Sequence, residues 1–416
     1  MMVAASLTAP SSRPRATDTS RRDLTAAWRH VDVVLVVCTL AVAALGTLMV
    51  FSATRARGVP GTADTTFLRR EAVFMLLGIG VMVGVTLFDY QRITNWIWPV
   101  YAAALLLLVL VVSPLGQRSN GAQAWFGFGP FQMQPAEFAK IALMVVLAAV
   151  MAGYKGDVDL KRLAILVVIA GIPMVLIMLQ PDLGMVLILV FVFMGMLLVS
   201  GIRGRHILLL TLVGCMGVWG VFSSNVLKQY QKDRLTTFLD TTSTGTSTAP
   251  AGSDGADGSG AKGSDQERAA RRGAATYNVE QSLNAIGAGG MFGQGLFEGK
   301  QTQLGFVPEQ HTDFIFTAVA EELGFVGAAT LLGLYAVIMW RIWRAASLSR
   351  DTFGSLICVG VLSFMMFQVF ENVGMTMNIM PVTGIPLPLM SYGGSSILTT
   401  FLAVGLVLNV HMHRFR

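Results

Sequence analysis

The fold of this chain is decided by apolar runs such as 31-VDVVLVVCTLAVAALGTLMVFSA-53, in which Asp32 is the one charged residue. A helix needs roughly 20 apolar residues to cross a bilayer, so this run predicts a membrane span. It is longer than the apolar region of a signal peptide, and no A-x-A-type cleavage site follows it. Of the 416 residues, 54% are hydrophobic and 13% are charged, whereas soluble proteins carry roughly 25% charged residues. We therefore predict an integral membrane protein.

Further apolar runs extend this to an all-α polytopic membrane protein with ten transmembrane helices and a large extracytoplasmic loop between spans seven and eight. The ten predicted spans lie near 31–53, 71–88, 95–114, 136–152, 162–179, 183–200, 206–224, 313–340, 353–379 and 389–410. Short loops that contain Lys155, Arg203 or Arg341 alternate with short loops at 180–182 and 381–388 that contain no Lys or Arg. Because basic residues accumulate on the cytoplasmic side, we expect both termini in the cytoplasm and the protein in the cytoplasmic membrane.

The predicted domain organisation follows from the same pattern. Polar residues dominate the start of the chain, and the segment 241–273 is rich in Ser, Gly, Thr and Ala, a composition that cannot bury enough apolar surface to fold. The expected organisation is a disordered cytoplasmic tail at 1–30, spans one to seven at 31–224, an extracytoplasmic loop at 225–312 with a disordered insertion at 241–273, spans eight to ten at 313–410, and a cytoplasmic tail at 411–416.

The net charge of +6 does not indicate nucleic-acid binding, because basic residues that flank membrane spans explain it. Cys38, Cys215 and Cys358 all lie in apolar runs, so the sequence suggests neither a disulfide framework nor a metal site.

Polar motifs converge on the outer face of the membrane and mark the predicted functional site. They are 119-SNGAQAWFGFGPFQMQPAEFAK-140, 180-QPDLG-184, the segment 277–316 and 381-PVTGIPLPLMSYGGSS-396. Charged groups within reach of the membrane are costly and indicate function.

Each motif also has a structural interpretation. Pro135 can begin a helix on which Glu137 and Lys140 form an i,i+3 pair, and Asp182 can cap a helix. The glycines of 287-GAGGMFGQG-295 fit no phosphate-loop spacing and predict a tight turn. Two carboxylates inside span eight, Glu321 and Glu322, can be buried structural acceptors.

Asp313 lies where the outer face meets span eight, and its role is open between two alternatives. It can be the N-cap of that span, although the capping-box position is Phe316. It can also be a general base, since partial desolvation and the neighbours Glu309 and His311 would tune its pKa.

The motifs together resemble the SEDS (shape, elongation, division and sporulation) family over nearly all of residues 31–410. They are QPAEFAK at 134–140, QPDLG at 180–184, QSLNAIGAGGMFGQG at 281–295, QTQLGFVPEQHTDFIF at 301–316 and PVTGIPLPLMSYGGSS at 381–396. The string 372-NVGMTMNIMPVTGIPLPLMSYGG-394 is more similar to the RodA branch, which acts in elongation, than to the FtsW branch, which acts in division.

The resemblance implies a peptidoglycan glycosyltransferase that polymerises lipid II into β-1,4 glycan strands, together with a class B penicillin-binding transpeptidase and membrane lipids. It places the family's essential aspartate on Asp313 and its motif lysine on Lys140. The other residues expected to bind substrate are Gln134, Glu137, Trp125, Gln281, Ser282, Gln303, Glu309, His311, Thr312, Ser391 and Tyr392. The chain departs from the family at Ala124, where many members carry Arg, and in its long insertion.

The expected chemistry needs one base, because the diphosphate leaving group of lipid II requires no acid. Asp313 would activate the acceptor hydroxyl, and Lys140 would stabilise the charge on the diphosphate. A bound divalent cation, Mg²⁺ or Mn²⁺, is an alternative source of that positive charge. The alternative functions are a flippase for the lipid-linked precursor and a non-catalytic scaffold for the transpeptidase.

Overall fold

The computed structural model describes residues 30–55, 65–119, 122–128, 131–154, 159–202, 204–223 and 277–414. The predicted disordered insertion at 241–273 and residues 1–29 of the predicted tail lie outside the described residues.

A helix corresponds to each of the ten predicted spans. The helices are α2 (Val33–Arg55), α3 (Thr66–Leu87), α4 (Ile97–Val112), α5 (Pro135–Ala152), α6 (Leu160–Leu179), α7 (Leu183–Val199), α8 (Gly204–Ser223), α12 (Ile315–Ser347), α13 (Thr352–Thr376) and α14 (Gly394–Met412). In the described part of the chain, eight helices are long and apolar enough to cross a membrane, and α7 is a shorter apolar helix. The prediction of a helical, polytopic membrane protein is confirmed.

Two helices begin at other residues than the sequence predicted. Helix α3 begins at Thr66, so Arg69 and Arg70 belong to its first turns and not to the preceding loop. The predicted tenth span began at residue 389, but α14 begins at Gly394, after an irregular segment. A 3-10 helix, η1 (Tyr90–Trp96), leads directly into α4.

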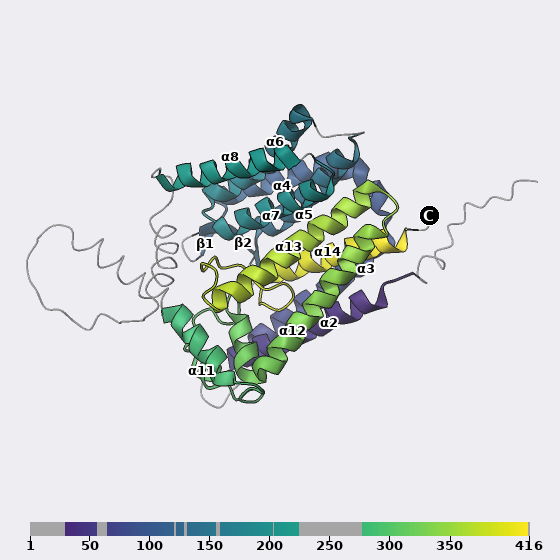
Figure 1. The fold of residues 1–416 in the computed structure, drawn as a ribbon. Helices are drawn as coiled ribbons and strands as arrows, with labels where there is room; N and C mark the ends of the chain where they lie inside the picture. The colour runs from purple at the N-terminus through teal and green to yellow at the C-terminus, as the bar shows by residue number, and fades with distance from the viewer. Residues whose placement is uncertain are drawn as a thin grey trace, which may run out of the picture.

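Three central helices carry the most buried faces of the bundle: α5, α13 and α14. Helix α13 contacts α5, α7, α12 and α14, while α3 packs along α14. The small sheet and α11 (Lys300–Leu304) lie toward one end of the bundle, and the C-terminus lies at the other (Figure 1). Most residues on the three central helices are thus covered by the surrounding helices.

A small antiparallel sheet was not predicted. Strands β1 (Gln117–Ser119), β2 (Ala122–Phe128) and β3 (Phe131–Met133) pair in the order β1-β2-β3 before α5 begins. Gln117 pairs with Trp125, and Phe126 pairs with Met133. The strands are short and bury little apolar surface, so their alternating pattern is weak in the sequence.

Helix α12 is broken at Gly324, whose backbone has φ +66° and ψ −166°. The glycine-rich stretch 287–295, which turns at 290–292, forms backbone hydrogen bonds with the two sides of the break. Phe325 N donates to Gly290 O, and Gln294 N donates to Glu321 O. A Cβ on Gly324 would lie 2.2 Å from Gly293 N, so the close approach requires glycine. The predicted tight turn is confirmed, and it supplies the backbone hydrogen bonds that a helix break inside a membrane protein demands.

The segment 377–393 between α13 and α14 is irregular, and most of its residues from 385 to 391 are buried inside the bundle. Tyr335 Oη donates to Pro388 O at 2.5 Å, and Ser391 Oγ accepts from Leu387 N at 2.8 Å. A Cβ on Gly46 would lie 2.4 Å from Leu389 O, so this glycine lets α2 approach the segment closely. Irregular backbone is stable at this depth because protein surrounds it.

Candidate active site

A buried ion pair forms the deepest part of the site. Lys140 Nζ lies 2.7 Å from Glu137 Oε2, and the two side chains are 0% and 1% exposed. Both residues lie in the first turns of α5, which begins at Pro135, and residues three apart share one face of a helix. Lys140 Nζ also lies 4.5 Å from the centroid of the Phe364 ring on α13. The structural interpretation of Glu137 and Lys140 as an i,i+3 pair is confirmed. Because the pair is buried, removing one partner costs far more stability than it would in a surface pair.

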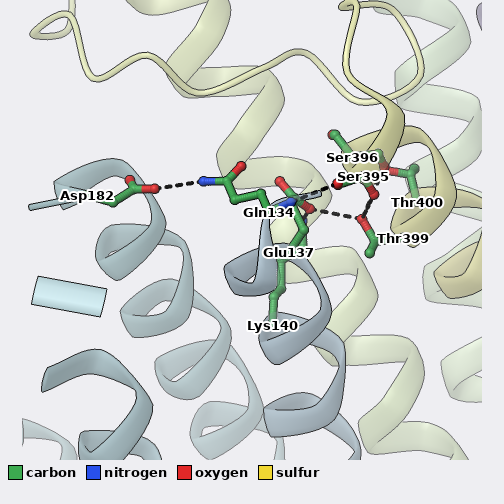
Figure 2. Close-up of polar contacts among 8 residues, drawn as sticks. All are labelled: Gln134, Glu137, Lys140, Asp182, Ser395, Ser396, Thr399 and Thr400. Atoms are coloured by element: carbon green, nitrogen blue, oxygen red, sulfur yellow. Dashed lines mark hydrogen bonds and ion pairs between the residues drawn. The ribbon is translucent and has the colours of Figure 1, made fainter. Parts of the chain in front are cut away.

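Gln134 precedes α5 and connects the start of that helix to α7 and α14. Its Nε2 donates to Asp182 Oδ2 at 2.9 Å, and its backbone N donates to Ser395 Oγ at 3.0 Å. Figure 2 shows Gln134 between Asp182 on one side and Ser395 on the other. Asp182 also accepts from Met185 N at 3.0 Å, so the predicted helix cap is confirmed.

Helix α14 completes the surroundings of Glu137. Thr399 Oγ1 lies 2.9 Å from Glu137 Oε2, and the same hydroxyl lies within hydrogen-bond distance of the carbonyls of Ser395 and Ser396. A hydroxyl carries one proton for these three acceptors, so Lys140 is the firmest donor to Glu137.

The segment 392–399 joins this pair to the neighbourhood of Asp313. At one end Tyr392 N donates to His311 O at 2.9 Å, and at the other end Thr399 reaches Glu137. One continuous piece of chain therefore contacts both predicted centres of the chemistry.

Asp313 precedes α12 in a turn and is partly exposed. The N-cap residue of α12 is Phe314, so the N-cap interpretation of Asp313 is wrong. Asn372 Nδ2 donates to Asp313 O and to Ile385 O, both at 2.8 Å. A Cβ on Gly384 would lie 3.2 Å from Asp313 Oδ2. The carboxylate thus lies against the irregular segment 377–393, and α13 holds its backbone in place.

Three rings pack beside Asp313. The His311 ring centroid lies 5.3 Å from that of Phe67 and 5.7 Å from that of Tyr392, and Phe67 and Tyr392 are 5.2 Å apart. Burial raises the pKa of Tyr392, and the neighbouring Arg70 partly offsets this. The phenol therefore stays protonated at neutral pH and is a hydrogen-bond donor.

The remaining predicted substrate-binding residues fall into two groups. Glu309 and Thr312 lie in the turn that holds Asp313: Asp313 N donates to Glu309 O at 3.1 Å, and Thr312 Oγ1 donates to the same carbonyl at 3.0 Å. Ser391 is 1% exposed, and its Oγ is bonded within its own loop.

The second group contacts other parts of the fold. Ser282 is fully buried, and its Oγ donates to Thr376 O at 2.7 Å, which ties helical residues 277–289, including half-buried Gln281, to α13. Gln303 lies on α11, and Trp125 lies on β2 beside Ala124, which is 2% exposed.

Glu321 and Glu322 are buried structural acceptors, as predicted. Glu321 accepts from Gln301 N at 2.7 Å and from Thr302 N at 3.0 Å, which caps the start of α11. Glu322 accepts from Ser52 Oγ and from Phe297 N. The two carboxylates fasten residues 297–302 to α12.

Sequence analysis missed a row of buried polar residues on α13: Gln368, Glu371 and Asn372. They are 0%, 1% and 0% exposed. Glu371 Oε1 accepts from Thr383 Oγ1 at 2.8 Å, next to Gly384 and hence close to Asp313. Polar residues spaced three and four apart inside the apolar run 353–379 are the signal that could have identified this row.

The described residues include no group of three or more His, Cys, Asp or Glu side chains placed to hold a metal ion. They do not by themselves fit the predicted divalent cation, which would need oxygen ligands from the substrate as well.

Comparison with known proteins identifies relatives over the full span of the helices. A family model described as cell cycle protein (FtsW, RodA and SpoVE) matches residues 32–416. The chain is 34% identical to stage V sporulation protein E of Bacillus subtilis over 91% of this chain and 96% of that protein. It is 32% identical to the peptidoglycan glycosyltransferase MrdB of Escherichia coli, with 92% and 94% covered.

Two solved structures match the chain over nearly its whole length. The crystal structure of the rod shape determining protein RodA of Thermus thermophilus matches with a TM-score of 0.65 and 30% identity, over 94% of this chain and 99% of that chain. A chain from a study of polymerization and crosslinking by a peptidoglycan synthase complex matches with a TM-score of 0.73 and 31% identity, over 93% and 99%. Proteins named RodA and SpoVE match at similar identity, so identity does not separate the branches.

Proposed function

Because the chain belongs to the FtsW, RodA and SpoVE family of cell cycle proteins, we propose that it is a peptidoglycan glycosyltransferase. Its substrate is lipid II, a disaccharide peptide on undecaprenyl diphosphate, and its product is a β-1,4 glycan strand on the outer face of the cytoplasmic membrane. Relatives named as peptidoglycan glycosyltransferases favour this enzyme over a flippase or a non-catalytic scaffold. The similarity of 372–394 to the RodA branch favours a role in elongation.

The observation that carries the proposal is the link between two unlike centres. One end of segment 392–399 binds His311, two residues before the partly exposed carboxylate Asp313, and the other end contacts the buried Lys140–Glu137 pair through Thr399. Sugar transfer from a lipid diphosphate needs a base at the acceptor and a cation at the leaving group. The two centres supply one each.

In the proposed reaction Asp313 accepts the proton of the acceptor 4-hydroxyl. The oxygen attacks the anomeric carbon of the donor, and the bond from that carbon to the diphosphate breaks. The diphosphate leaves with the electron pair, so the α-linked donor becomes a β-linked product. Lys140 stabilises the charge that grows on the diphosphate, and a divalent cation bound with the substrate would add to that stabilisation.

The proposed arrangement in the membrane places both termini in the cytoplasm and Asp313 at the outer face. The basic short loops support this orientation. The same orientation leaves the 225–312 segment outside, where a class B penicillin-binding transpeptidase would meet it. Similarity to a chain studied in a peptidoglycan synthase complex supports that partner.

The test is glycan synthesis by the purified protein in complex with its transpeptidase. The complex is incubated with lipid II and a divalent cation, and polymer is resolved on a gel. We expect polymer from the wild type and none from Asp313→Ala.

The matched control is Asp159→Ala, which removes an exposed carboxylate that accepts from Leu160 N at 2.7 Å. This variant is expected to polymerise normally per mole of folded protein. A folded wild-type complex that makes no polymer contradicts the proposed function, and polymer from Asp313→Ala contradicts the role of Asp313.

A further inference from the structure

One stripe of α13 faces α5 in an antiparallel register. A Cβ on Gly360 would lie 2.3 Å from Met144 Cγ, and the Phe364 ring lies under Lys140 Nζ. Residues four apart on a helix share a face, so the next member of the stripe is Gln368. As α13 advances by one turn, α5 recedes by one turn, which brings Gln368 to the level of Ala136, the residue before Glu137.

Gln368 and Glu137 carry complementary unused groups. Gln368 is fully buried, and in the described part of the chain neither its Nε2 nor its Oε1 has a hydrogen-bond partner. Glu137 Oε1, also buried, has none either, while Glu137 Oε2 serves both Lys140 and Thr399. A buried amide without partners is costly, so a donor and an acceptor left unused at nearly the same level of two facing helices require an explanation.

The proposed reaction creates a need for that donor. When Lys140 turns to the diphosphate, Glu137 loses its cation and remains a buried carboxylate. The Thr399 proton cannot compensate fully, because the hydroxyl also faces the carbonyls of Ser395 and Ser396. A second donor near Glu137 would lower the cost of releasing Lys140.

We propose that Gln368 is a positioning residue that holds Glu137 when Lys140 engages the diphosphate of the substrate. In the resting state Lys140 is bound to Glu137, and the Gln368 amide makes no hydrogen bond. In the engaged state Gln368 Nε2 donates to Glu137 Oε1, so the carboxylate keeps its place while Lys140 is shared with the leaving group. This inference rests on the proposed function for the identity of the anion.

The first experiment measures Gln368→Met, a substitution of similar volume that removes both polar atoms. Binding of undecaprenyl diphosphate to the purified complex is expected to weaken about tenfold, as for the loss of one hydrogen bond to a charged group. For lipid II polymerisation kcat is expected to fall about tenfold, with KM changed by less than about twofold. Ser363→Ala is the control, because its hydroxyl donates to Val359 O and packs toward Gly195 on α7; it should change neither quantity.

The second experiment is a thermal-unfolding cycle that requires no activity. Gln368→Met alone should leave the unfolding temperature unchanged or raise it, because it removes an amide without partners. In a Lys140→Met background Gln368 is the remaining donor to Glu137 Oε1, so adding Gln368→Met should lower the unfolding temperature. The change of sign is the signature of the proposed contact.

The outcomes are distinguishable. Equal effects of Gln368→Met in both backgrounds overturn the inference, as does undiminished undecaprenyl diphosphate binding. If the wild-type complex makes no polymer, the proposed function fails, and the unfolding cycle still decides whether Gln368 supports Glu137.

Discussion

Replacing Gly384 with alanine tests how tightly the position of Asp313 limits the reaction. Gly384 has φ +73°, and a Cβ built on it would lie 3.2 Å from Asp313 Oδ2. The substitution therefore introduces one methyl group beside the proposed base and changes no charge.

Two separate costs follow. A residue with a Cβ pays about 1–2 kcal/mol for the left-handed conformation, which lowers the free energy of unfolding. The contact at 3.2 Å is tighter than ordinary packing, so the carboxylate must move by a few tenths of an ångström. Since a displacement of about 1 Å can cost roughly 100-fold in rate, we expect kcat to fall about tenfold.

Gly305→Ala is the matched control, because Gly305 has φ +66° and nothing lies within 4 Å of its would-be Cβ. Both variants should lose similar stability, and only Gly384→Ala should lose polymerisation rate. The assay is the initial rate of lipid II polymerisation per mole of folded complex, with thermal unfolding measured in parallel. Equal rates for the two variants would show that a Cβ at position 384 does not displace the Asp313 carboxylate.

Three further changes have defined outcomes. Lys140→Met leaves the buried Glu137 carboxylate without its counter-ion and should destabilise the protein by about 3–5 kcal/mol in equilibrium unfolding, whereas adding Glu137→Met should recover most of the loss; no recovery would argue against the pair. Gly324→Ala should prevent recovery of monodisperse protein, while Gly290→Ala, with φ +55° and open space around it, should be tolerated. Glu321→Gln removes a carboxylate that accepts three hydrogen bonds from Gln301 and Thr302, so the chain around these two residues should become more sensitive to protease. Unchanged cleavage would show that other contacts hold this segment.

The helical architecture could be predicted because each span carries its own signal. A run such as 31–53 must be a helix in a bilayer whatever its neighbours do. The sheet of β1 to β3 could not be predicted, because its short strands depend on pairing between residues such as Gln117 and Trp125. The break at Gly324 was equally hidden, since it is stable through backbone bonds from residues 290–294, far away in the sequence.

The site could be predicted where its contacts are local. The i,i+3 spacing indicated the Glu137–Lys140 pair, and Pro181 before Asp182 indicated a cap. Contacts between residues far apart in the sequence have no local pattern from which to predict them. Thr399, for example, contacts Glu137 from 262 positions away. Asn372 fixes Asp313 in the same way, from 59 positions away.

If Asp313 is the base for sugar transfer, single-turnover polymerisation by Asp313→Asn isolates the step in which it acts. The complex is loaded with lipid II, and the rate of the chemical step is compared with that of the wild type at equal bound substrate. We expect a rate at least about 100-fold lower with lipid II binding changed by less than about twofold, since loss of a general base typically costs this much. A wild-type rate from Asp313→Asn would show that another group is the base.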